Sequence, residues 1–189
     1  MKKLRAVLGL FLGAVLLSSC SLIPQSKAPV TVAKEKVPFG LLDKNIPGTN
    51  TSVQFTQTPV YLVHSGRLVA SRRIVTSPVQ VVAALNQLLL RVSEKESAAH
   101  LKTDIPRGLQ ILQVSVLNGV ARVNLAASIS AFNLLENPLA VGQVVLTAQA
   151  AGARSGVVFA IEGISQDAMG PSGKTVPRVY GYQYSRLVN

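Results

Sequence analysis

The clearest pattern along the chain is an alternation of apolar and polar residues on both sides of Asn118-Gly119. This dipeptide favours a two-residue hairpin turn, because a type I′ turn needs a positive φ at both central residues. Pairing outward from the turn separates the apolar from the polar residues, and a slip of one residue would destroy this separation. The predicted core face holds Leu112, Val114, Val116, Ala121, Val123 and Leu125, and the predicted wet face holds Gln113, Ser115, Arg122 and Asn124.

A second hairpin is predicted earlier in the chain, where apolar residues 60–63 and 68–70 flank Ser65-Gly66. The turn is either a two-residue turn or a three-residue type I turn with Gly66 in a bulge, since Ser is a poor residue at positive φ. The second strand of this hairpin continues through Arg72 and Arg73.

Two segments have apolar residues at helical spacing. The first runs through residues 81–92, with Ser77 as the expected N-cap and Gln80 completing a capping box. The second starts at Asn137-Pro138 with Asn137 as its cap and ends before Gly152. The wide apolar stripe of the first helix predicts that it lies on a sheet.

The segments between these elements differ in character. Residues 93–102 are mostly polar and are expected to form a loop, and residues 126–136 are expected to be irregular. The apolar run 157–161 fits an inner strand that Glu162-Gly163 closes. The tail, 164–189, either adds an edge strand or packs on the domain.

The predicted element order is therefore β-β-α-β-β-α-β. Antiparallel hairpins between two helices favour an α+β two-layer sandwich, with a mostly antiparallel sheet and both helices on one face. We assign one domain to residues 59–163.

The N-terminus carries an export signal. Lys2, Lys3 and Arg5 precede the apolar run 6–17, which as a helix would rise about 18 Å, well short of the roughly 30 Å hydrocarbon core of a bilayer. Residues 1–19 are therefore predicted to be a signal peptide.

The end of this leader, Leu17-Ser18-Ser19-Cys20, resembles the lipobox of bacterial lipoproteins. The resemblance implies that the leader is cut before Cys20 and that acyl chains on the Cys20 thiol anchor the protein at the outer face of the cytoplasmic membrane. The competing interpretation is an ordinary signal peptide that happens to end in Cys.

Residues 20–58 are expected to be a flexible, lipid-anchored tether, because they contain scattered Pro and Lys without an apolar period. The exception is the apolar cluster of residues 37–42, which either docks on the domain or inserts near the membrane interface; docking is the favoured alternative.

Composition limits the chemistry. The 189 residues include one Cys and no Trp, so a disulfide framework and a four-cysteine metal site are excluded. The net charge is +11, but because the protein is expected to work outside the cytoplasm, this charge does not indicate DNA or RNA binding. The positive charge instead suits anionic lipid or wall polymers, or simply a solvated surface.

No catalytic arrangement stands out. His64 and His100 are the two histidines. A Ser/His/Asp arrangement could be drawn from His64, Asp104 and a serine, but no nucleophile-elbow sequence supports it. The acidic residues are scattered, no phosphate-binding glycine loop is found, and metal ligands are missing. We predict no enzyme activity, no cofactor and no metal.

Residues 59–163 resemble a GerMN domain, the module of the sporulation and spore-germination protein GerM and of many bacterial lipoproteins. Together with the lipobox and tether, the chain is similar to actinobacterial lipoproteins of this group. The segments that carry the resemblance are Val60-Tyr61-Leu62-Val63, Gly66-Arg67-Leu68-Val69, Ala84-Leu85, Leu88-Leu89, Thr103-Asp104-Ile105-Pro106, Val114-Ser115-Val116, Gly119-Val120-Ala121, Val123-Asn124-Leu125, residues 140–147 and Val158-Phe159 with Glu162-Gly163.

The resemblance implies a fold like the ring-building modules of secretion and sporulation assemblies, and protein–protein contact in the cell envelope instead of catalysis. The expected partners are the membrane, through Cys20, and an envelope protein. The alternative function is binding of an anionic wall or membrane polymer through Arg72, Arg73 and Arg122, whose side chains suit planar anions.

Overall fold

The computed structural model describes residues 53–189, so Cys20, the leader and the apolar cluster of residues 37–42 lie outside the described residues. The described residues share one apolar core. Their elements are β1 (Phe55–His64), β2 (Arg67–Thr76), α1 (Val81–Leu89), α2 (Glu94–Ala98), β3 (Ile111–Leu117), β4 (Val120–Leu125), α3 (Ile129–Glu136), α4 (Pro138–Ala150), β5 (Val157–Ile161), β6 (Ile164–Gln166), β7 (Ala168–Met169), β8 (Thr175–Val176) and the 3₁₀-helix η3 (Gly181–Tyr184).

The strands form separate sheets, which corrects the prediction of a single one. β1 and β2 make a two-stranded ribbon, and β3, β4, β5 and β6 make a four-stranded sheet in that order, with β7 and β8 as a short extra pair. β4 and β5 are parallel, while the neighbouring pairs are antiparallel. A parallel pair needs a crossover connection, which α3 and α4 provide. The α+β class is confirmed.

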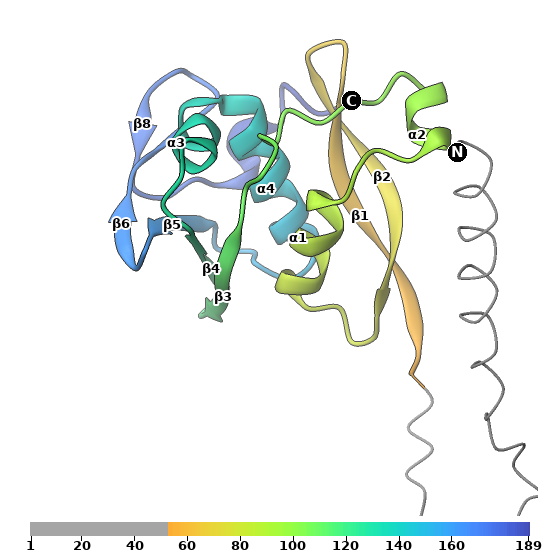
Figure 1. Cartoon of the computed structure of the whole chain (residues 1–189), viewed down its shortest axis with the longest axis horizontal. Helices are drawn as coiled ribbons and strands as arrows, with labels where there is room; N and C mark the ends of the chain where they lie inside the picture. The colour runs from red at the N-terminus through yellow and green to blue at the C-terminus, as the bar shows by residue number, and fades with distance from the viewer. Residues whose placement is uncertain (1–52) are drawn as a thin grey trace, which may run out of the picture. The chain divides into compact units, whose positions relative to one another are not determined.

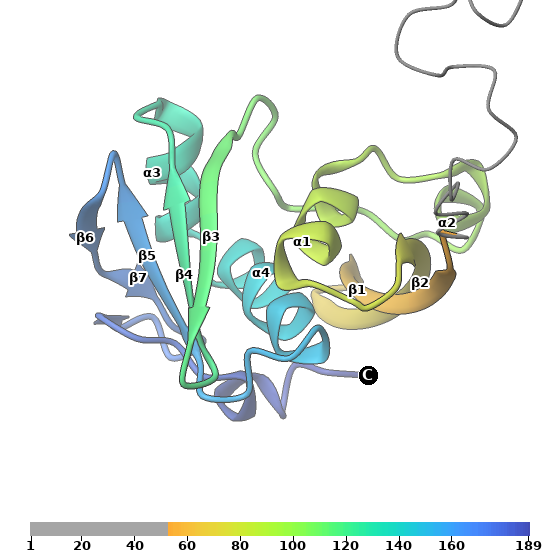
Figure 2. The same ribbon diagram turned by 90° about the horizontal axis from the view of Figure 1, so that it is seen from below.

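Helices α1 and α4 lie between the ribbon and the four-stranded sheet, as Figures 1 and 2 show from two directions. α4 begins at Pro138, and the Asn137 side chain accepts hydrogen bonds from the first-turn N–H groups, as predicted. Nine of the 13 residues of α4 are buried, as expected of a helix that is covered on more than one side. Within residues 53–189 no single helix is long and apolar enough to span a membrane; α3 and α4 pass that test only together, bent by 88°.

Two polar side chains of α4 hold the ribbon by its β1 edge. The Thr147 hydroxyl accepts a hydrogen bond from the Tyr61 N–H at 3.0 Å. The Gln143 amide donates to the Tyr61 carbonyl and accepts from the Asp104 N–H, both at 2.8 Å. Gln143 and Thr147 are fully buried, so these bonds satisfy polar groups that would otherwise be costly inside the core.

The first hairpin has the two-residue turn. Ser65 and Gly66 both have positive φ, 49° and 76°, and His64 pairs with Arg67 across the turn. β1 starts at Phe55, four residues before the predicted start of the domain, and Pro59 lies inside the strand. Pro is tolerated there because it stands on a sheet edge.

The register of the second hairpin is confirmed from the turn outward to the pair Gln113 and Asn124. One step further a bulge pairs Ile111, instead of the predicted Leu112, with Leu125. Leu112 is 51% exposed and Val116 is 46% exposed, so both were wrongly assigned to the core. The reason is that β3 is an edge strand, which helices cover only in part.

The helix predictions need three corrections. α1 begins after Gln80, which is extended and makes no side-chain cap bond, so Ser77 is not the N-cap. The predicted loop at residues 93–102 contains α2, and the predicted irregular stretch at 126–136 contains α3. Ser93 and Ser128 cap these short helices through their hydroxyls.

The tail beyond residue 163 both extends and covers the domain. β6 adds a strand beside β5. Val179 bridges to β5, and Tyr184 in η3 is fully buried. Both alternatives considered for the tail are therefore realised.

Candidate functional site

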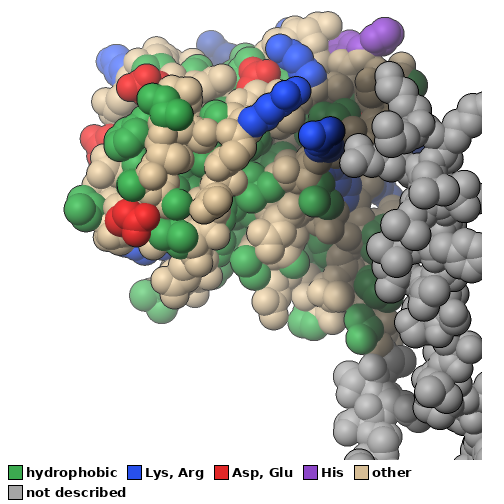
Figure 3. Space-filling model, viewed as in Figure 1, with side chains coloured by type: hydrophobic (Ala, Val, Ile, Leu, Met, Phe, Trp, Pro, Cys, Tyr) green, Lys and Arg blue, Asp and Glu red, His purple; other side chains and the backbone are tan. Residues whose placement is uncertain are grey.

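A groove runs along the outer edge of β2. Its walls are residues 70–74 of β2 on one side, and on the other the end of α1 with Leu90 and Arg91 and helix α2 with Lys95. The volume of the groove is about 590 Å³. Exposed hydrophobic side chains are also scattered over other parts of the surface (Figure 3).

A buried ion pair holds α2 beside β2. The guanidinium of Arg73 binds both carboxylate oxygens of Glu96, through Nε at 3.0 Å and Nη2 at 2.8 Å. The two side chains are 9% and 7% exposed. This two-point geometry is the one that Arg forms best with a carboxylate.

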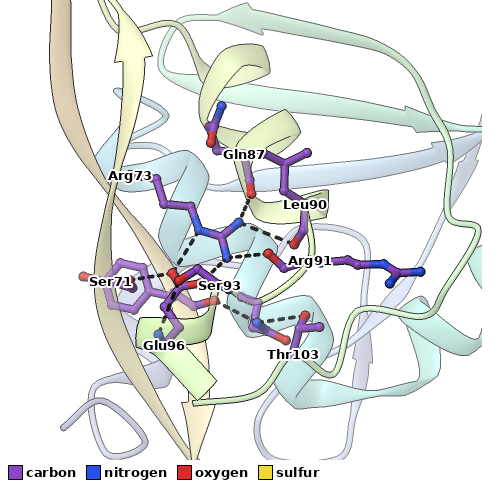
Figure 4. A network of polar contacts seen from close by, with 10 residues as sticks. Ser71, Arg73, Gln87, Leu90, Arg91, Ser93, Glu96 and Thr103 are labelled. Atoms are coloured by element: carbon purple, nitrogen blue, oxygen red, sulfur yellow. Dashed lines mark hydrogen bonds and ion pairs between the residues drawn. The ribbon is translucent and has the colours of Figure 1, made fainter. Parts of the chain in front are cut away.

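The same guanidinium also closes the end of α1. Arg73 Nη1 donates to the carbonyl oxygens of Gln87 and Leu90, and Nη2 donates to that of Arg91 (Figure 4). α1 has no basic residue in its own last turn, so Arg73 supplies the positive charge that a helix C-terminus favours. One side chain of β2 therefore orders both helices that wall the groove.

The carboxylate of Glu96 is fully satisfied. It accepts further hydrogen bonds from the Ser71 hydroxyl and the Ser93 N–H, both at 2.7 Å, and Ser93 and Glu96 form a reciprocal capping box. Burial alone would raise the pKa of Glu96, but the hydrogen bonds from Arg73, Ser93 and Ser71 outweigh it and lower the pKa from 4.5 to about 2. Glu96 therefore stays ionised at any physiological pH.

The three arginines predicted as an anion or partner surface do not form one surface. Arg72 is exposed on β2, next to Arg73, whose side chain is 9% exposed. Arg122 lies on β4, in the other sheet, where Nη2 donates to the Gly163 carbonyl at 2.7 Å. The role of Glu96 was not predicted from the sequence, although the spacing of Ser93 and Glu96 is that of a capping box.

The remaining candidate groups, His64, His100 and Asp104, are not among the residues that line this groove. His64 Nδ1 is 3.3 Å from the His100 carbonyl, and Asp104 pairs with Lys102 at 3.3 Å. Among residues 53–189, no cluster of three or more His, Cys, Asp or Glu side chains could hold a metal ion. Cys20 lies outside the described residues.

The fold defines a class of protein: a mixed α+β domain whose central helices lie between a two-stranded ribbon and a four-stranded sheet. In this domain the Arg73–Glu96 ion pair holds α2 and the end of α1 beside β2. A family model, Germane, described as sporulation and spore germination, matches residues 49–167, and the chain belongs to this family. The matched range includes the ribbon, both central helices and the four-stranded sheet.

One solved structure is similar, the tandem GerMN domains of the sporulation protein GerM from Bacillus subtilis. The TM-score is 0.53 at 17% sequence identity, and the match covers 69% of this chain and 46% of that chain. At this identity the likeness concerns the fold alone. No curated protein matched the chain.

Proposed function

We propose that this chain is a lipid-anchored protein of the cell envelope whose GerMN-like domain binds another protein and carries out no catalysis. Family membership and the lipobox-like leader ending at Cys20 support the proposal. The observation that carries it is the groove beside β2, an open sheet edge with apolar and basic walls, held in shape by the Arg73–Glu96 pair.

The anchor is tested by mass spectrometry of the protein purified from membranes. We expect an N-terminal Cys20 carrying a thioether-linked diacylglycerol, and we expect Cys20→Ser to leave the leader uncut. An unmodified Cys20 thiol on a released protein would contradict the anchored location.

The binding role is tested by crosslinking in intact cells that make the protein, followed by purification in moderate salt. A discrete envelope protein that is retained at that salt supports the proposal. Retention of wall polymer instead, lost as the salt rises, would favour the alternative, in which the exposed Arg72 and the half-buried Arg122 bind an anionic polymer.

A further inference from the structure

We propose that the groove beside β2 binds an extended, acidic and apolar peptide segment of the partner protein by adding it as a third strand to the ribbon. The inference rests on the proposed function and specifies how the partner is recognised.

The two edges of the ribbon differ in how far their outward backbone groups are hydrogen-bonded to the rest of the fold. On the β1 edge, Pro59 has no N–H, Tyr61 is bonded to α4, and Val63 exchanges two hydrogen bonds with Lys102. These features close that edge to another strand.

The β2 edge is closed at one position and open at the next three. Because His64 and Arg67 flank a two-residue turn, alternate residues from Leu68 onward direct their backbone groups away from β1. Leu68 uses them: its N–H donates to the Leu187 carbonyl at 2.7 Å, and its carbonyl accepts from the Asn189 N–H at 3.1 Å. The end of the chain therefore already lies on this edge in the manner of an added strand.

Ala70, Arg72 and Ile74 have the same outward orientation, and no backbone hydrogen bond reaches them from elsewhere in the part of the chain that is described. Three such positions match a segment of about five residues, roughly 17 Å long. Backbone pairing of this kind supplies affinity, and alternate side chains supply specificity.

The walls of the groove indicate which side chains the segment carries. Ile74 and Leu90 are 62% and 54% exposed, so an apolar side chain between them would remove apolar surface from water. Arg72, Arg91 and Lys95 line the same groove, and none of the three forms a salt bridge with another described residue. The carboxylate of Glu96 is already neutralised by Arg73. Acidic side chains thus complement the walls.

Charge also disfavours a second copy of this chain as the occupant. In a two-fold symmetric pairing of β2 with β2, a residue near the middle of the open stretch meets its own copy. Arg72 is that residue, and like charges opposite each other destabilise a strand pair.

The test uses three synthetic peptides that share a six-residue length. One alternates Val and Glu, the second alternates Val and Lys, and the third is the Val/Glu peptide with alternate backbone nitrogens methylated. Binding to a lipid-free form of the chain, residues 21–189, which lacks the leader and Cys20, is measured by fluorescence anisotropy at low salt. We expect binding of the Val/Glu peptide and at least a tenfold weaker binding of the other two.

Two variants locate the binding on the chain. Ala70→Pro removes one outward N–H and is compared with Ala70→Val, which retains it; we expect at least a fivefold weaker binding for Ala70→Pro alone. The double variant Arg91→Gln, Lys95→Gln should weaken binding about two- to fivefold for each charge removed, the range for exposed ion pairs. The control is Lys174→Gln, on the distant turn between β7 and β8, which should leave binding unchanged. Circular dichroism confirms that each variant is folded.

Equal binding of the methylated peptide, or of the Val/Glu peptide to folded Ala70→Pro, would overturn strand addition. A concentration-dependent dimer that Ala70→Pro abolishes would overturn the choice of occupant in favour of a second copy. If the crosslinked envelope partner persists with Ala70→Pro, the present inference fails while the proposed function stands. If no envelope protein crosslinks to the unaltered chain, the proposed function itself is contradicted.

Discussion

Replacing Glu96 by Gln tests the energetic role of the buried ion pair. The substitution keeps the size of the side chain but removes the charge that Arg73 binds at 2.8 Å. The pKa of Glu96 is lowered from 4.5 to about 2, which corresponds to about 3 kcal/mol of unfolding free energy at neutral pH. Because the pKa is lower in the folded chain, this stabilisation is complete above pH 4.5, declines as the pH falls from 4.5 towards 2, and is lost below that range.

The assay is chemical denaturation of residues 21–189 with and without Glu96→Gln, from about pH 7 down to about pH 2. We expect the variant to be about 3 kcal/mol less stable at neutral pH and the difference to shrink steadily in acid. Glu94→Gln, at an exposed carboxylate on the same helix, is the matched control and should change stability by less than about 0.5 kcal/mol. A difference below about 1 kcal/mol at neutral pH, or one that does not change with pH, would refute the reasoning.

Three further substitutions test the packing around α4. Gly142→Ala should cost about 1–3 kcal/mol in thermal or chemical unfolding, because the new Cβ would lie 2.6 Å from the Tyr184 ring. Its control is Gly170→Ala, whose new Cβ would have the Lys174 carbonyl oxygen as its nearest neighbour, at 3.5 Å. Tyr184→Phe should leave the stability unchanged or raise it slightly, since the buried hydroxyl has no hydrogen-bond partner among the described residues. A loss of stability above about 1 kcal/mol would contradict this reasoning. Gln143→Leu should cost about 2–5 kcal/mol, because it removes the hydrogen-bond partner of the Asp104 N–H and of the Tyr61 carbonyl. Full stability of this variant would show that those groups find other partners.

Local sequence signals predicted much of the fold. The turn at Asn118-Gly119 determined the pairing of β3 with β4 for five successive pairs, because both central residues accept positive φ. Asn137 was identified as a helix cap for an equally local reason, its short side chain reaching the N–H groups of the next turn. Such features depend on a few consecutive residues and can be recognised without knowledge of the rest of the fold.

The division into two sheets could not be predicted in the same way. Alternation along β1 and β2 indicates that a face is buried, but not whether a sheet or a helix buries it. The parallel pairing of β4 with β5 depends on where α4 returns the chain, and α4 is buried over most of its surface. The spacing of apolar residues along the sequence does not determine where α4 returns the chain.

The role of Arg73 also depends on distant residues. Arg72 and Arg73 look equivalent in the sequence, but neighbouring strand residues point to opposite faces. Arg73 is the one whose guanidinium bonds to α1 and α2. The partner of Arg73 is Glu96, which is 23 positions away on a helix of five residues. So short a helix is marginal by itself, and the capping box at Ser93 was the one local signal of it.

The dependence of α2 on the ion pair gives the groove a property that simple charge counting would not predict. Among residues 53–189, Glu96 is the one carboxylate that lines the groove. Its removal makes the walls more positive and by Coulomb attraction alone should strengthen the binding of an acidic peptide. However, Glu96 also fixes α2, and with it Lys95, beside β2. We therefore expect Glu96→Gln to weaken binding of the Val/Glu peptide at neutral pH, by more than Lys95→Gln does. Tighter binding would mean that the groove acts as a simple positive surface and that its shape contributes little to recognition.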